Sequence, residues 1–72
     1  MQVREIRQQS DEDIKVRLEE SRRELFNLRQ DWYLGSLQDH NRITEVKRDI
    51  ARMKTVLRER ELAMLIEREG GS

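Results

Sequence analysis

The sequence contains no cysteine and only one histidine, His40. Without cysteine the chain forms no disulfide and offers no thiolate ligand, and a single imidazole does not make a metal cluster. We therefore expect no metal and no other cofactor. Small folds usually depend on a disulfide, a metal or a partner for their stability. For these 72 residues, binding to a partner is the route that remains.

Proline is also absent, glycine occurs three times, and Phe, Trp and Tyr occur once each. Charged residues make up 42% of the chain and hydrophobic residues only 35%. This composition is typical of long, exposed helices rather than of a globule with a deep core. No apolar run reaches the length of a transmembrane helix, and no signal-peptide pattern opens the chain. The predicted location is therefore the cytoplasm.

The residues that catalysis requires are missing as well. The sequence has no glycine-rich phosphate loop, and no serine has a base at helical spacing. Acids in the first half alternate with arginines three or four residues apart, which favours solvated ion pairs over acid–base chemistry. A thin helical protein also lacks the dry pocket that an active site needs. The chain is therefore predicted not to be an enzyme.

The strongest pattern that is present is a pair of apolar seams. In the stretch 42–60, apolar residues recur at steps of three and four, which is typical of a coiled-coil seam: Ile43, Val46, Ile50, Met53 and Leu57. A second seam with the same steps, interrupted by Ser21, lies in the first half of the chain: Ile14, Leu18, Leu25, Leu28 and Trp32. Two such helices joined by a few residues predict an all-α protein, a long antiparallel two-helix hairpin.

Local signals set the expected boundaries within a single domain, 1–72. Ser10 followed by three acids reads as a helix N-cap, and Gly35 as a C-cap in the left-handed conformation. Asp39 is the predicted N-cap of the second helix. The expected elements are a helix over about 10–34, a turn over about 35–39, a helix over about 40–65 and a disordered tail over 70–72.

The two ends of the chain are less regular. Val3 and Ile6 lie three residues apart, so residues 1–9 either form one helical turn that docks on the hairpin or fray, and both alternatives stay open. Met64 continues the heptad from Leu57. The second helix is therefore expected to overrun the first.

The second helix also carries a basic flank. Between residues 42 and 60 there are seven basic and three acidic residues. At roughly 100° per residue, five cations lie away from the seam, among small side chains that let a phosphodiester backbone approach. The predicted RNA-binding residues are Lys47, Arg48, Arg52, Lys54, Arg58, Thr44 and Thr55. Contacts to phosphate and sugar of folded RNA are the expected mode, and a merely solvated face is the alternative.

The same stretch carries a resemblance. The run from Val46 to Arg60, preceded by Arg42 and Ile43, is similar to the second helix of the bacterial large-subunit ribosomal protein twenty-nine family. The residues 24–29, ELFNLR, resemble the first-helix signature of that family, and 35–37 its turn. The match covers nearly the whole chain up to residue 62. Family members are usually more basic than this chain, whose formal net charge is zero.

This resemblance implies a structural constituent of the large ribosomal subunit with a scaffolding role. It implies a helical hairpin near the exit of the nascent-peptide tunnel, in contact with large-subunit ribosomal RNA and a neighbouring protein of the exit rim. It also implies a position beside the surface where nascent-chain-associated factors dock. No membrane or small-molecule substrate is expected. The rival interpretation is a coiled-coil protein–protein interaction module that binds no RNA, because two seams in one chain can also pair between chains.

Overall fold

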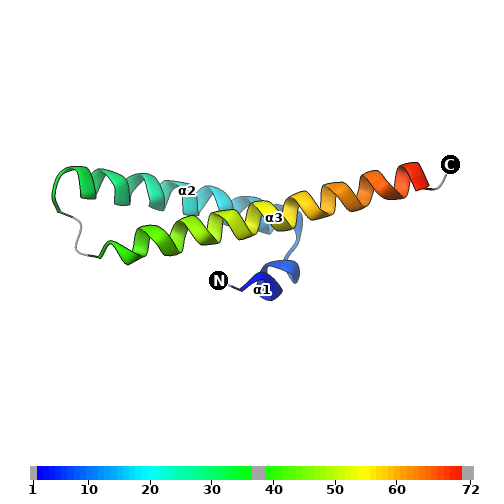
Figure 1. Ribbon diagram of the computed structural model, residues 1–72, viewed down its shortest axis with the longest axis horizontal. Coiled ribbons are helices and arrows are strands. Elements are labelled where there is room, and N and C mark those ends of the chain that lie inside the picture. Colours follow the sequence, from blue (N-terminus) through cyan, green and yellow to red (C-terminus); the bar gives the residue numbers. More distant parts are fainter. Residues whose placement is uncertain (1, 37–38, 71–72) are drawn as a thin grey trace.

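The computed structural model describes residues 2–36 and 39–70, with side chains through residue 68. These residues form three helices (Figure 1). They are α1 (Val3–Arg7), α2 (Asp11–Tyr33) and α3 (Asn41–Gly70). α2 and α3 pack against each other as an antiparallel hairpin, and α1 packs against α3. The molecule measures 57 × 19 × 17 Å and is therefore a rod. The predicted all-α hairpin is confirmed, and residues 3–7 form a docked helix.

Side-chain and backbone caps fix both ends of α2. The Asp13 backbone N–H donates to Ser10 Oγ at 3.2 Å, so the predicted N-cap is confirmed. At the other end Gly35 has φ of +77°, the left-handed conformation that the sequence predicts for it. The Ser36 N–H reaches the Asp31 carbonyl at 2.8 Å, and the Gly35 N–H reaches the Trp32 carbonyl at 3.0 Å. This pair of bonds is the Schellman motif.

The connection to α3 ends in a second cap. The Asn41 backbone N–H donates to Asp39 Oδ1 at 3.0 Å, so Asp39 supplies a side-chain acceptor at the start of α3. Two residues of the predicted turn, Leu37 and Gln38, lie outside the described residues.

The core lies where all three helices meet. Its buried side chains are Ile6, Ile14, Leu18, Val46, Ile50, Met53 and Val56. Val3, Leu25, Leu28 and Leu57 pack against this cluster while partly exposed, and Ile43 is half-buried. The α2–α3 seam is thus real, but it is only one of two contact lines on α3.

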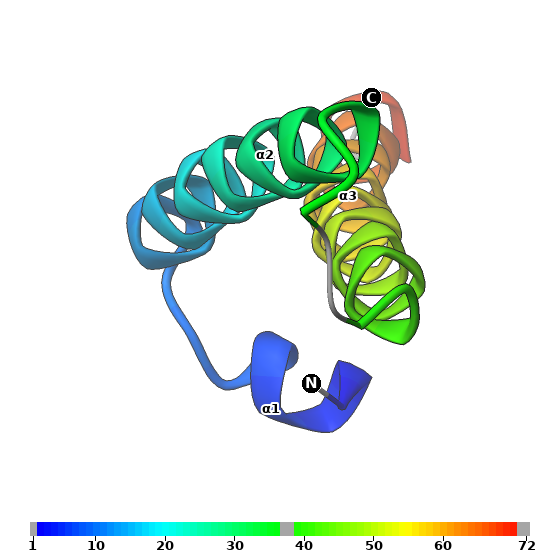
Figure 2. The ribbon, with the colours of Figure 1, turned by 90° about the vertical axis from the view of Figure 1, so that its left-hand side faces the viewer.

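The second contact line explains two buried residues that lie off the predicted seam. Ile6 is 0% exposed and Val56 is 1% exposed, whereas the predicted seam residue Leu57 is only partly buried. Val56 lies roughly 100° round the helix from Leu57, on the side where α1 docks. Figure 2, which views the rod end-on, shows α1 on one side of the α2–α3 pair. The short helix therefore extends the core round α3.

Arg60 links α3 to α1, to the α1–α2 connection and to α2. Its guanidinium donates to the carbonyls of Arg7 at 3.1 Å and Gln9 at 2.8 Å, and it pairs with the Asp11 carboxylate. One α3 side chain thus holds the end of α1, the connecting segment and the first residue of α2. Beside it, Arg7 and Glu59 form an ion pair at 3.2 Å.

Trp32 corrects the predicted seam. Its side chain is 60% exposed, although its heptad position predicts burial. The ribbons of α2 and α3 lie further apart at the turn than near the middle of the rod (Figures 1 and 2). α1 docks away from the turn, near the beginning of α2. Trp32 packs edge-on against His40 instead, with ring centroids 6.3 Å apart. It therefore braces the turn rather than filling the helix–helix core.

α3 continues to Gly70, past the expected end at residue 65. Because α2 begins at Asp11, opposite Arg60, the last turns of α3 project beyond the hairpin (Figure 1). The apolar side chains of this projection are exposed: Leu62, Met64, Leu65 and Ile66. Of the predicted tail, Gly71 and Ser72 lie outside the described residues.

Replacement of Gly35 tests the turn. A Cβ at this position meets nothing within 4 Å, so the cost of a side chain is entirely that of its backbone conformation. We expect Gly35→Val to lower the free energy of unfolding by about 1 kcal/mol or more, because a branched residue is strained at positive φ. Gly35→Asn should cost less, since Asn tolerates this region. Thermal unfolding followed by circular dichroism gives the comparison, and equal stability of both variants and the parent would contradict this turn.

Replacement of Arg60 tests the junction. Arg60→Gln removes the charge and most of the donors that reach the two carbonyls, so we expect a loss of about 1–2 kcal/mol. Hydrogen exchange at the amides of α1 should accelerate more than exchange in the middle of α2. Arg58→Gln is the matched control, because Arg58 pairs only within α3, with Glu61 at 3.4 Å. Equal exchange in α1 for the two variants would mean that Arg60 does not hold the helix.

Candidate nucleic-acid interface

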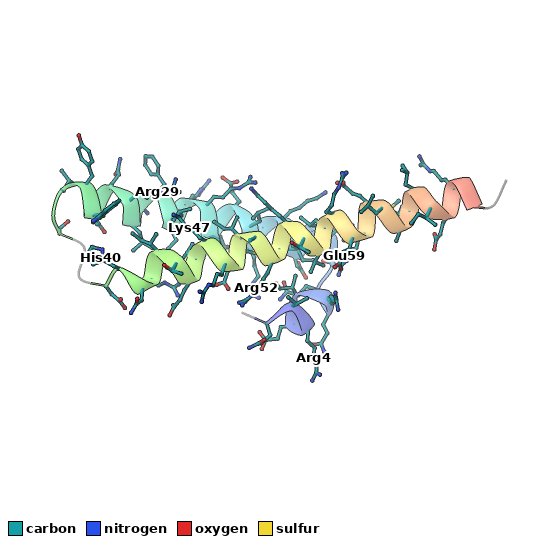
Figure 3. All side chains as sticks on the ribbon, in the orientation of Figure 1. Arg4, Arg29, His40, Lys47, Arg52 and Glu59 are labelled. Carbon is teal, nitrogen blue, oxygen red and sulfur yellow. The ribbon has the colours of Figure 1, made fainter. Side chains whose placement is uncertain are left out.

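The predicted RNA-binding residues of α3 do not share one surface. Measured from the seam at 100° per residue, Lys47, Lys54 and Arg58 lie on one flank. Arg52 lies on the other flank, which faces α1. Figure 3 shows this division: Arg52 and Glu59 lie on the α1 side of α3, and Lys47 on the side away from α1.

A third group of predicted residues lies on the back of α3, opposite the seam: Thr44, Arg48 and Thr55. All three are exposed, as is the neighbouring Ala51. Thr55 Oγ1 donates to the Ala51 carbonyl at 2.8 Å, so this hydroxyl is bonded to the helix itself. The exposed side chain of Thr55 is therefore held close to the helix, beside Arg58 and Lys54. A shallow hollow lies there, lined by Lys54, Thr55, Arg58, Glu59 and Leu62.

Two arginines of α3, Arg42 and Arg52, each form ion pairs. Arg42 bonds to Glu24 of α2 at 2.6 Å and to Glu45 at 3.2 Å. The hydrogen bond to Glu24, followed by that to Glu45, raises the pKa of Arg42. Arg52 lies 3.8 Å from Asp49. Arg42 therefore links the two helices of the hairpin, whereas this Arg52 contact lies within α3, and each arginine has an acid beside it.

The cations on the flank away from α1 are less engaged. Lys47 and Lys54 have no ion pair within the described part of the chain, and Arg58 has only its exposed contact to Glu61. Lys47, Lys54 and Arg58 are exposed. They are thus available to an anion without unfolding the hairpin. We call these three residues the α3 flank.

α2 contributes cations to the same face of the rod. Lys15, Arg22 and Arg29 recur every seven residues, roughly 60–100° from the α2 seam. Because the helices are antiparallel and pack seam to seam, this side of α2 and the α3 flank face the same way. Arg29 and Lys47 both lie on the side away from α1 (Figure 3). Lys15, Arg22 and Arg29 add to the RNA-binding residues predicted on α3, and their seven-residue spacing is the signal that marks them.

Other kinds of site have no support in the described residues. Among residues 2–36 and 39–68, no three His, Asp or Glu side chains gather in a way that could hold a metal ion. Within the same limits, no helix has the length and apolar character needed to cross a bilayer. The hollows that line the rod are open surface features rather than enclosed pockets. What the described surface offers is one cationic face.

The sequence is similar to proteins of one known family. Residues 4–60 match the family model described as Ribosomal L29 protein. Proteins called large ribosomal subunit protein uL29 are among the similar sequences. The one from Thermosipho melanesiensis is 48% identical over 64 residues, which cover 89% of this chain and 97% of that protein. The one from Finegoldia magna is 52% identical over 62 residues, covering 86% and 91%.

A third relative is similar over a comparable length. The protein of the same name from Saccharopolyspora erythraea is 44% identical over 66 residues, which cover 92% of this chain and 82% of that protein. The family match spans more than half of the chain, and the relatives align over most of their own length. The resemblance read from residues 24–29 and 42–60 is therefore confirmed. The chain belongs to the ribosomal L29 protein family, whose members are non-enzymatic structural proteins of the large ribosomal subunit.

Proposed function

We propose that the protein binds large-subunit ribosomal RNA through the α3 flank. The observation that carries the proposal is that Lys47, Lys54 and Arg58 are exposed and, at 100° per residue, share the flank of α3 that faces away from α1. None of the three joins α3 to another helix by an ion pair among the described residues. Lys and Arg supply the salt-dependent, sequence-independent part of RNA affinity by meeting phosphates. The small side chains on the adjoining back of α3 let an RNA backbone approach.

The other predicted residues take different places in this proposal. Arg48, Thr44 and Thr55 lie next to the α3 flank on the exposed back of α3 and extend the contact there. Arg52 lies towards α1 and beside Asp49, so we expect a smaller effect from its loss. We further propose, from the family resemblance, a place near the exit of the peptide tunnel. There the protein would contact a neighbouring exit-rim protein and border nascent-chain-associated factors.

The rival function, a coiled-coil module without RNA, finds less support. The seam that such a module would share with other chains is already used within this chain, where Val46, Ile50 and Met53 are buried against α1 and α2. Pairing between chains by that seam would require the hairpin to open. The RNA proposal needs no such rearrangement.

Removal of the α3 flank tests the proposal. We expect the variant Lys47→Gln, Lys54→Gln, Arg58→Gln to keep its helical circular dichroism, because the three side chains are exposed. Its affinity for large-subunit RNA should fall. The slope of log affinity against log salt should decrease by up to about one unit for each phosphate that the variant no longer neutralises.

A variant with the same change in charge provides the control. Arg4, Arg17 and Arg68 are exposed cations off the α3 flank, one on each helix. Their joint replacement by Gln should leave a steeper salt dependence than the flank variant shows. If the two triple variants lose affinity equally, only net charge matters, and the α3 flank is not the RNA-binding surface.

A further inference from the structure

We propose that α2 carries a base-stacking surface for unpaired RNA nucleotides, formed by Phe26 and Tyr33, which alternate along the helix with the cations Arg22 and Arg29. This inference rests on the proposed RNA binding and adds a kind of contact that a purely cationic flank does not make. It concerns a helix whose outer face the hairpin does not use.

The arrangement follows from helical spacing. Lys15, Arg22 and Arg29 recur at steps of seven, and Phe26 and Tyr33 are also seven apart. At 100° per residue all five fall within a sector of roughly 60° on α2. Between residues 15 and 33 this sector contains no acid, although α2 as a whole is rich in acids. Cations and aromatic rings therefore alternate along one strip, which we call the α2 strip.

The acids of α2 lie outside this sector, although Glu19 lies at its edge, where it lines a shallow hollow with Arg22 and Phe26. Glu24 pairs with Arg42 at 2.6 Å across the hairpin, and Glu19 lies 3.8 Å from Arg23. Arg22 and Arg29, by contrast, have no ion pair within the described residues. Their positive charge is therefore not neutralised by the protein itself, which makes the strip complementary to an anion.

The aromatic residues of the strip do not serve the fold. Phe26 is 62% exposed and Tyr33 is 91% exposed, and neither belongs to the core. A shallow hollow between them is lined by Phe26, Arg29, Gln30, Tyr33 and Leu34. Trp32, the remaining aromatic residue, lies off the strip and packs on His40. Phe26 and Tyr33 are thus exposed beside Arg22 and Arg29, which have no ion pair among the described residues.

The positive charge of the α2 strip indicates which kind of partner can bind there. An apolar protein surface would bury the rings but would leave Arg22 and Arg29 without anionic partners, which is costly. A single-stranded RNA segment offers bases for stacking and phosphates for the arginines in the same molecule. Double-stranded RNA keeps its bases stacked inside the helix, so it cannot use the rings in this way. The α2 strip also adjoins the α3 flank on the same face of the rod, so one RNA can contact both.

The binding experiment uses the full chain with two RNA probes, a ten-nucleotide oligoadenylate and a blunt RNA duplex of the same length. The test variant is Phe26→Leu with Tyr33→Leu, which keeps apolar side chains but removes both rings. A stacked base contributes about 1–3 kcal/mol, so the affinity for oligoadenylate should fall at least about fivefold. The affinity for the duplex should change less than about twofold.

Two control variants separate stacking from other effects. Trp32→Leu removes a ring off the strip and should leave the oligoadenylate affinity as it is. Arg29→Gln should weaken oligoadenylate binding more than Arg23→Gln, because Arg23 lies off the strip beside Glu19. An equal loss for both probes in the double Leu variant, or an equal loss with Trp32→Leu, would overturn the stacking surface.

The two RNA proposals fail in distinguishable ways. If the double Leu variant binds oligoadenylate like the parent while the α3 flank variant loses affinity, the stacking surface is wrong and the α3 flank stands. If neither variant loses affinity, both are wrong.

In assembled large subunits, ultraviolet irradiation should attach a nucleotide to the peptide containing Phe26 or Tyr33. A photoreactive residue at position 33 that cross-links only to protein would instead overturn the proposal and assign the strip to a protein neighbour.

Discussion

The structure depends on the burial of α3 against two elements at once. A hairpin of two thin helices hides only one stripe of each, and a chain of 72 residues has little surface to bury in the first place. α1 adds a second line of contact through Ile6, which is completely buried with Met53 and Val56. Arg60 fixes the geometry of that contact by donating to the backbone carbonyls of Arg7 at the end of α1 and of Gln9 in the connection to α2. The five residues of α1 thus extend the core to a second side of α3.

Docking of α1 also decides which surface remains for a partner. One flank of α3 is covered, and the Arg52 side of the helix belongs to the covered region. The opposite face carries Lys47 and Lys54 on α3, together with Arg22 and Arg29 on α2. The same event that completes the core therefore leaves one face of the rod rich in cations.

Most of the fold was predictable because its signals are local. The steps of three and four in both seams predict the helices, and the capping residues Ser10 and Gly35 predict where α2 begins and ends. Burial of Ile6 and Val56, the role of Arg60 and the exposure of Trp32 were not predictable in this way. Each depends on where α1 docks and on how far the helices separate at the turn, which heptad spacing does not encode. The spacing of the α2 strip is present in the sequence, but its position beside the α3 flank follows only once the two helices are placed together.

The arrangement also explains how a chain with no net charge can present a cationic face. Several acids are committed to the fold: Glu24 bonds to Arg42 across the hairpin, Asp11 to Arg60 and Glu59 to Arg7. Those pairs neutralise positive charge at the seam edge and on the α1 side. Among the cations without an ion pair in the described residues, a group on α2 and α3 lies on the face away from α1: Lys15, Arg22, Arg29, Lys47 and Lys54. Over distances of about a Debye length, roughly 8 Å at physiological ionic strength, an RNA backbone responds to that local excess rather than to the sum over the chain. The spatial sorting of charge by ion pairs, rather than total basicity, is therefore the property on which RNA binding by this protein would rest.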